Sequence, residues 1–447
     1  MTDLFLVLSF VGFLALGTLA PFVFGLGYVW VDTFLPHRIS DALLTDVPVA
    51  LIMAIAALVS YVVLDRRAAP RIGPLHLLYF VLAFWITMTT TWAVAPGPAW
   101  FKWDPSFKAL MFAAFIPFIF RSRVQIEAFL QVMIFSVAAH IIPWGIKTAL
   151  SGGGYNQALG QLGVNASFLS ESSAIAALCF TFVPLLLHLS RYNLIIPPGR
   201  LTRVGFYGMA AIYALGAIGT FARVALVGLA VMYIGMWIRA KRRVWFTIFA
   251  TIGLFAMTAF TSAQWTQRIS TIENYQTEDS ALTRILIWRW AWGFAQDNPF
   301  GGGFNAFVVN HITIPTADSL APRVENGRAF HNIYFAVLAE HGYPGIVLYL
   351  SILIGTFFSL QRTRRRLKSH LDHAWAFQLA GALQISLATF LACANFIDVS
   401  FNPIMWDLLG LGLALQAYAR RAVPDALRRR IELGPVRTQV PAMARTG

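Results

Sequence analysis

Long apolar runs follow one another along almost the whole chain, and they constrain its fold more than any other feature. A membrane-spanning helix needs about 20 predominantly apolar residues. Only 12% of the 447 residues are charged, against about 25% in a soluble domain. We therefore predict an all-α, polytopic integral membrane protein with about 12–13 transmembrane helices. The thirteen candidate runs are residues 3–18, 20–35, 46–64, 74–94, 107–120, 126–147, 172–189, 204–221, 223–238, 244–262, 331–360, 375–396 and 403–419.

One of these runs is too long for a single straight span. Residues 331–360 contain Gly342, Pro344 and Gly345, and both residue types interrupt helices. We expect a short helix, a break and then a span. The first run of the chain has no basic segment before it, so we expect a retained span and not a cleaved signal.

Positive charge alternates from loop to loop. Six basic segments hold 24 of the 34 lysine and arginine residues, and the predicted spans place all six on the same side. Because basic loops remain in the cytoplasm, the net charge of +14 is a topology signal, and we expect no nucleic-acid partner. The basic segments are residues 65–71, 121–123, 191–203, 239–243 and 362–368 and the tail from Arg420.

The spans divide the chain into four parts. Residues 1–262 hold the first set of transmembrane helices, and residues 331–421 hold the second. Residues 263–330 form the largest loop, which this topology places outside the cytoplasm. The tail, residues 422–447, is rich in arginine and lacks an apolar run, so we expect it to be cytoplasmic and disordered.

Within the large loop, residues 281–296 have the periodicity of a helix. Ile285, Trp288, Trp292 and Ala295 recur at spacings of three and four, which predicts an amphipathic helix. We expect it to lie along the membrane surface with its tryptophans at headgroup depth.

Three arginines on the extracytoplasmic side are candidate anion ligands. Arg223 sits between two apolar runs with almost no loop around it. It is either an interfacial arginine that reaches the headgroups or part of a buried anion site. Arg284 and Arg289 are five residues apart on the predicted helix, so they diverge by about 140° around its axis. We do not expect them to serve one ligand equally.

The segment "NPFGGGF" follows this helix. Pro299 ends the helix, and Gly301, Gly302 and Gly303 allow a tight backbone turn. A P-loop would continue with Lys and then Ser or Thr, which are missing here. A plain turn is therefore favoured over a phosphate-binding loop.

His331 is the candidate acid–base group. Most single histidines are structural, but His331 lies on the extracytoplasmic side at a predicted helix start, beside Asn332 and near Arg328. A histidine in that place can accept a proton near neutral pH. His341 follows within the apolar run, and we interpret it as structural.

The sequence gives no reason to expect a metal or another cofactor. No His/Asp/Glu motif has metal-binding spacing, and no nucleophile-elbow motif occurs. The two cysteines, Cys179 and Cys393, lie inside apolar runs, where we expect them to be buried as small hydrophobic residues.

Four motifs in order resemble the O-antigen ligase and polymerase superfamily of bacterial envelope glycosyltransferases. They are "FAR" with Arg223, "RILIW" with Arg284, "NPFGGGFNAF" and "HNIYFAVLAEHGYPG". The segments "MTDLFLVL", "LPHRI" and "SGGGY" are similar to the O-glycosylation ligases that accompany exosortase systems. The resemblance covers roughly residues 1–420. Where relatives have Asn-Glu before a span, this chain has "LSESSAIA", so Glu171 would take that place.

The resemblance implies a glycosyltransferase in the bacterial inner membrane. Its donor would be a glycan on undecaprenyl diphosphate, and its acceptor a hydroxyl group at the periplasmic face. The implied reaction is O-antigen transfer to lipid A-core in lipopolysaccharide biosynthesis, without a metal and with inversion at the transferred sugar. Besides donor and acceptor, the only expected partners are membrane lipids.

Roles for single residues follow from the resemblance together with the residue types. Arg223 and Arg284 would bind the diphosphate, because the guanidinium fork suits phosphate oxygens. His331 would be the catalytic base toward the acceptor hydroxyl. The possible supporting residues are Arg289, Arg328, Glu171 and Asn332.

Three other functions stay open. A polysaccharide polymerase and a protein O-oligosaccharyltransferase would use the same donor chemistry with a different acceptor. A lipid or glycan transporter is the alternative that is not an enzyme. It is disfavoured because no internal repeat is visible and because the spans are poor in central Asp, Glu and Lys.

Overall fold

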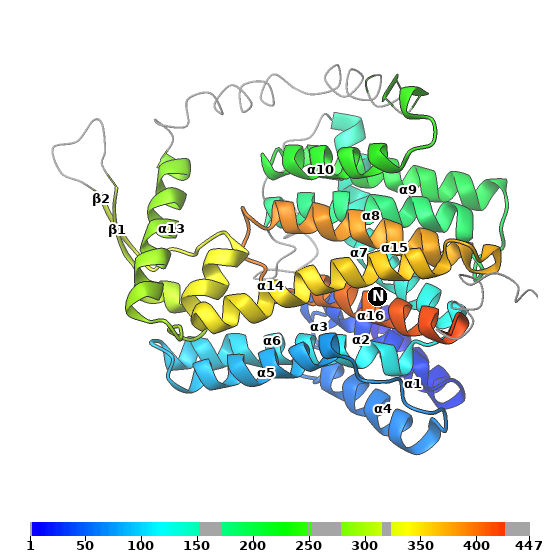
Figure 1. Ribbon diagram of the computed structural model, residues 1–447, viewed down its shortest axis with the longest axis horizontal. Helices are drawn as coiled ribbons and strands as arrows, with labels where there is room; N and C mark the ends of the chain where they lie inside the picture. Colours follow the sequence, from blue (N-terminus) through cyan, green and yellow to red (C-terminus); the bar gives the residue numbers. More distant parts are fainter. Residues whose placement is uncertain are drawn as a thin grey trace, which may run out of the picture.

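Figure 1 shows the computed structural model, which describes residues 2–151, 171–245, 247, 248, 251, 279–314 and 323–424. The described chain is helical almost throughout. Its α-helices are α1 (Thr2–Leu19), α2 (Phe22–Phe34), α3 (Pro36–Ile39), α4 (Val49–Leu64), α5 (Pro74–Thr91), α6 (Pro96–Ile119), α7 (Arg123–Ser151), α8 (Ser172–Tyr192), α9 (Arg200–Gly219), α10 (Val224–Arg239), α13 (Asp279–Asp297), α14 (Ile333–Leu367), α15 (Ala374–Cys393) and α16 (Pro403–Ala422). The shorter elements are the 3₁₀ turns η3 (Ala306–Val309) and η4 (Leu371–His373) and the strands β1 (His311–Ile314) and β2 (Arg323–Asn326).

Seven of the described helices are long and apolar enough to cross a membrane, and three shorter helices are also apolar. This finding confirms the predicted all-α, polytopic membrane fold. The predicted run at 244–262 lies almost entirely outside the described residues, so the total of about 12–13 spans stays a prediction. The seven long helices are α1, α5, α7, α8, α9, α14 and, together with η4, α15, and the shorter ones are α2, α4 and α10.

Helix α8 lies inside the helix bundle, where it packs against α9, α10 and α15 (Figure 1). Both cysteines are buried and free, Cys179 on α8 and Cys393 at the end of α15, as the sequence indicated. Helices α1 and α4, in contrast, turn large apolar side chains outward. Phe5 and Val62 are 62% and 71% exposed. An apolar face of this kind is suited to lipid and not to water.

A second, smaller apolar core lies outside the main bundle. Side chains of α13, of β1 and of the first turns of α14 form it together with Phe330, and its members include Ile287, Ile312 and Ala336. Figure 1 shows α13 and the two strands together at one end of the molecule, beside the start of α14. This core holds part of the predicted extracytoplasmic loop against the bundle.

The sequence prediction for this loop missed one pair of strands. The antiparallel pair β1–β2, in which His311 faces Asn326, was not predicted. The predicted helix exists as α13. Ile285 and Trp292 of the predicted apolar stripe are about half exposed, and their contact with the membrane surface stays a prediction. Ile287 and Ala291 are buried and pack in the second core with residues of β1 and α14.

Candidate functional site

His331 precedes Asn332, which is the N-cap residue of α14. The Asn332 side-chain oxygen accepts hydrogen bonds from the backbone N–H groups of Tyr334 (2.9 Å) and Phe335 (3.2 Å). Its amide nitrogen donates to the carbonyl of Asn395 at 3.1 Å. The cap therefore locks the start of α14 to the connection between α15 and α16.

The backbone of His331 is itself unusual. Its φ is +48°, in the left-handed region that residues other than glycine seldom adopt. The Ile333 N–H donates to the Ala394 carbonyl at 3.1 Å, and Trp288 Nε1 donates to the Phe330 carbonyl at 2.9 Å, so hydrogen bonds hold the residues on both sides of His331. Such strained residues cluster at functional sites.

A pocket of about 270 Å³ lies in front of His331. Arg284 reaches it from α13, and Arg328 reaches it from the segment between β2 and α14. The structure thus brings together three of the residues that the sequence analysis singled out. The remaining lining residues are Thr283, Ile287, Ile314, Arg323 and Glu325.

The surroundings of His331 favour its neutral form. Burial lowers the pKa of the imidazole, and Arg284 lowers it further, while Asp398 raises it and Arg328 lowers it. Among the described residues, the buried Nδ1 atom of His331 has no hydrogen-bond partner. A neutral imidazole at neutral pH is what a general base requires.

Glu171 belongs to the same electrostatic cluster. Burial raises the pKa of its carboxyl group, and so does Asp398, whereas Arg284 lowers it. Glu171 directly precedes α8, so four parts of the chain contribute charges here: the start of α8, α13, the start of α14 and the connection after α15. The structure therefore places Glu171 in the electrostatic environment of Arg284.

Arg328 lies at the exposed rim of the pocket. Its guanidinium forms a short ion pair with Glu325, which also pairs with Arg323 at 2.5 Å. The hydrogen bond from Arg328 lowers the pKa of the Glu325 carboxyl. The fully buried Asn310 holds the Arg328 backbone through hydrogen bonds of 2.7 and 3.0 Å.

Arg223 and Arg289 do not line this pocket. Arg289 is exposed on α13. Arg223 is exposed directly before α10, next to Val224, whose carbonyl lies 3.8 Å from Cys393 Sγ. The Ala394 carbonyl, at the end of α15, accepts a hydrogen bond from the Ile333 N–H. Arg223 and His331 therefore lie at the same end of α15. Arg223 and Arg284 thus stand on different elements, and of the two only Arg284 lines the pocket.

Sequence reasoning missed a buried ion pair beside the site. Lys102 Nζ on α6 lies 2.8 Å from Glu340 Oε1 and 3.9 Å from Asp398 Oδ1. Glu340 is fully buried and also accepts a hydrogen bond from the Asn305 N–H at 2.8 Å. The sequence did contain a signal for this pair. Glu340 is an acidic residue in an apolar run, and such a residue is costly without a partner.

The glycine run, Gly301 to Gly303, packs against the break in α14. Gly302 and Gly303 donate their N–H groups to the carbonyls of Ala339 and Glu340, at 2.9 and 2.8 Å. Gly342 has a φ of +67° and interrupts the helix, as predicted. A Cβ on Gly301 would lie 2.5 Å from the Glu340 carbonyl oxygen. The run is therefore a tight turn against α14, and all three of its glycine N–H groups donate hydrogen bonds within the protein, Gly301 to the Asn298 carbonyl at 2.8 Å.

Two protein families match separate parts of the chain. Residues 208–350 match the O-antigen ligase family, and residues 1–194 match a family of unknown function, DUF5935. A search of curated proteins gave no match. Residues 208–350 thus form an O-antigen ligase domain, which supports the superfamily that the motifs indicated and suggests a glycosyltransferase-like membrane enzyme. Arg223, Arg284, Arg289, Arg328 and His331 all lie within the O-antigen ligase match.

Proposed function

We propose that this chain transfers a glycan from undecaprenyl diphosphate to an acceptor hydroxyl group at the periplasmic face of the bacterial inner membrane. The acceptor that we propose is lipid A-core, so that the reaction completes lipopolysaccharide. The observation that carries the proposal is the pocket that His331 shares with Arg284. It lies within the segment that matches the O-antigen ligase family.

In the proposed reaction, the acceptor oxygen forms a bond to the anomeric carbon of the transferred sugar. The bond from that carbon to the diphosphate oxygen breaks, and its electron pair leaves with the diphosphate. His331 takes the hydroxyl proton, which its lowered pKa permits. A single displacement requires attack opposite the leaving group, so the configuration inverts.

The leaving diphosphate carries negative charge that needs stabilisation. Arg284 lines the pocket, and a guanidinium can donate two hydrogen bonds to one phosphate group. Arg223, at the start of α10, would contact the diphosphate from the bundle side. Arginines on these two sides of the diphosphate suit a donor whose polyprenyl tail stays in lipid while its sugar enters the aqueous pocket.

Asp398 supports His331 as a positioning residue. Its carboxylate raises the pKa of the imidazole, so it stabilises the imidazolium that forms when the proton arrives. Lys102 holds Asp398 from the other side, 3.9 Å away. Asn332 fixes the helix start. Arg328 would bind an acceptor anion at the rim of the pocket, Glu171 would add to the local field, and Arg289 would contact lipid headgroups from the exposed face of α13.

Reconstitution tests the proposal directly. The purified chain would be placed in liposomes with a glycan linked to undecaprenyl diphosphate, and lipid A-core, a second lipid-linked glycan or a serine-containing peptide would be offered in turn. We expect transfer to lipid A-core, unaffected by EDTA. Transfer to only one of the other acceptors would reassign the chain as a polymerase or a protein oligosaccharyltransferase. Movement of the intact donor across the membrane without transfer would contradict an enzymatic function.

A further inference from the structure

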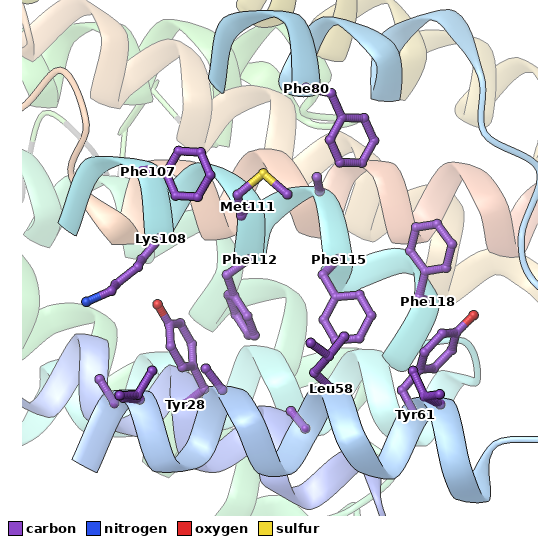
Figure 2. A pocket seen from close by; sticks show the side chains of 16 residues that line it. Tyr28, Leu58, Tyr61, Phe80, Phe107, Lys108, Met111, Phe112, Phe115 and Phe118 are labelled. Atoms are coloured by element: carbon purple, nitrogen blue, oxygen red, sulfur yellow. The ribbon is translucent and has the colours of Figure 1, made fainter. Parts of the chain in front are cut away.

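An apolar groove of about 420 Å³ runs between α4 and α6 on the outside of the bundle. Figure 2 shows Phe107, Met111, Phe112, Phe115 and Phe118 along α6, with Phe112 and Phe115 pointing toward α4, which carries Leu58 and Tyr61. All of the lining residues lie within the family match of unknown function, and none belongs to the site around His331. The groove is therefore separate from the proposed glycan transfer.

The groove has the length of one bilayer leaflet. Its lining extends from Ala50 in the first turn of α4 to Val62 in the last. Twelve helical steps cover about 18 Å, close to half of a hydrocarbon core of about 30 Å. Leu58 and Val62 are more than half exposed, so the groove opens sideways to the bilayer. These dimensions fit one acyl chain.

The two ends of the groove differ. Lys108 and the hydroxyl of Tyr28 lie at one end, and Tyr61 and Phe118 lie at the other (Figure 2). The second end approaches the predicted cytoplasmic loops, because Arg67 donates a hydrogen bond to the Ile119 carbonyl at 3.4 Å. The Lys108 end therefore faces the side of the candidate site, which is the side of the outer leaflet.

A pair of opposite charges stands at this end. Lys108 Nζ lies 2.6 Å from Asp104 Oδ2, one helical turn beyond the groove, and the two side chains are 46% and 54% exposed. Both groups keep free capacity, since an ammonium has three donors and a carboxylate about four acceptor sites. A second carboxyl group, that of Asp32, interacts with Lys108 and accepts a hydrogen bond from Tyr28. One cation thus stands among two acids.

This charge pattern selects the occupant. A purely anionic headgroup would meet Lys108 but also face Asp104. A choline headgroup has no N–H group to donate to Asp104. We propose that the groove between α4 and α6 binds one acyl chain of an outer-leaflet phosphatidylethanolamine, whose phosphate contacts Lys108 and whose amine contacts Asp104.

Lipid retention by the full chain tests this site without any glycan donor, so the outcome does not depend on the proposed function. The purified, delipidated chain would be incubated with equal amounts of phosphatidylethanolamine, phosphatidylcholine and phosphatidylglycerol that carry identical acyl chains. Native mass spectrometry would then count the retained lipids. We expect phosphatidylethanolamine to exceed each of the others by about fivefold, the scale of one solvent-exposed ion pair.

Two phenylalanine variants locate the acyl chain, and a third variant tests the headgroup. Ala54→Phe fills the groove and should abolish the retention, whereas Ile55→Phe, on the neighbouring position outside the lining, should keep it. Asp104→Lys should shift the preference to phosphatidylglycerol. Equal retention of the three lipids, a preference for either of the other two in the unaltered chain, or equal retention by the two phenylalanine variants would overturn the proposal. If Ala54→Phe does not fold, the exposed Asp104→Lys variant decides.

Discussion

Lys102 on α6 and Glu340 on α14 form an ion pair of 2.8 Å across 238 residues of sequence, and the glutamate is fully buried. The same ammonium lies 3.9 Å from Asp398, which acts electrostatically on His331. The pair therefore joins the two family-matched parts of the chain directly behind the candidate site. A charge buried without its partner is strongly unfavourable.

The first prediction concerns stability. Lys102→Met leaves Glu340 without its cation and should lower the free energy of unfolding by about 3–5 kcal/mol. Lys108→Met, on the same helix, breaks an exposed pair and should cost at most about 1 kcal/mol. Thermal unfolding in detergent would measure both. Equal effects of the two substitutions would mean that burial does not decide the strength of the Lys102 pair.

The second prediction concerns the diphosphate. Arg284→Ala and Arg223→Ala should each reduce turnover at least about tenfold, because a charge-assisted hydrogen bond contributes about 1.5–3 kcal/mol. Lysine at either position should restore activity only in part, since it lacks the planar fork. Arg289→Ala is the matched control on the exposed side of α13 and should retain most activity. A larger loss for Arg289→Ala than for Arg284→Ala would reverse the assignment.

The third prediction concerns pH. The base must be neutral, so kcat/KM should fall as the pH drops through the pKa of His331. Burial and Arg284 lower that pKa, while Asp398 raises it. Asp398→Asn should therefore move the acidic limb to lower pH, and Arg284→Gln should move it to higher pH. Asp372→Asn, on η4, should leave the limb in place. Shifts of the same sign in the first two variants would show that the limb does not report His331.

The fourth prediction concerns the break in α14. A Cβ at Gly342 would lie 2.2 Å from the Pro299 carbonyl oxygen, at a φ of +67°. Gly342→Ala should therefore lower stability by about 1–3 kcal/mol or more. Gly293→Ala on α13, where a Cβ meets nothing within 4 Å, should instead stabilise by about 0.5–1 kcal/mol. Melting temperatures of the two variants that move in the same direction would contradict this account.

Periodicity and residue type were sufficient to predict most of the helices. The long apolar runs correspond to helices because a buried backbone in lipid must satisfy its hydrogen bonds locally. The break at Gly342 was also predicted, because glycine and proline act locally. Helix α6 differed: it begins at Pro96, well before its apolar run, since polar residues such as Lys102 find partners on α14.

What the sequence did not reveal depends on contacts between distant segments. The face of α13 that Ile287 and Ala291 bury against β1 and α14 depends on those distant segments, so the pattern of the helix alone did not reveal it. Each strand of the β1–β2 pair has only four residues, too few for a periodic signal. Asp398 and Glu340 became candidates only when Lys102 was placed between them. His331 was found because one motif carries it together with Asn332.

The central claim is that His331 accepts the acceptor's proton, and His331→Ala in the reconstituted transfer assay tests it most directly. Loss of a positioned base should reduce transfer about a hundredfold to ten-thousandfold, while folding and donor binding stay intact. His311→Ala, at an exposed histidine on β1 that contacts Asn326, controls for loss of an imidazole in the same loop and should transfer normally. Near-normal transfer by His331→Ala would contradict the account and leave catalysis to the arginines at the leaving group.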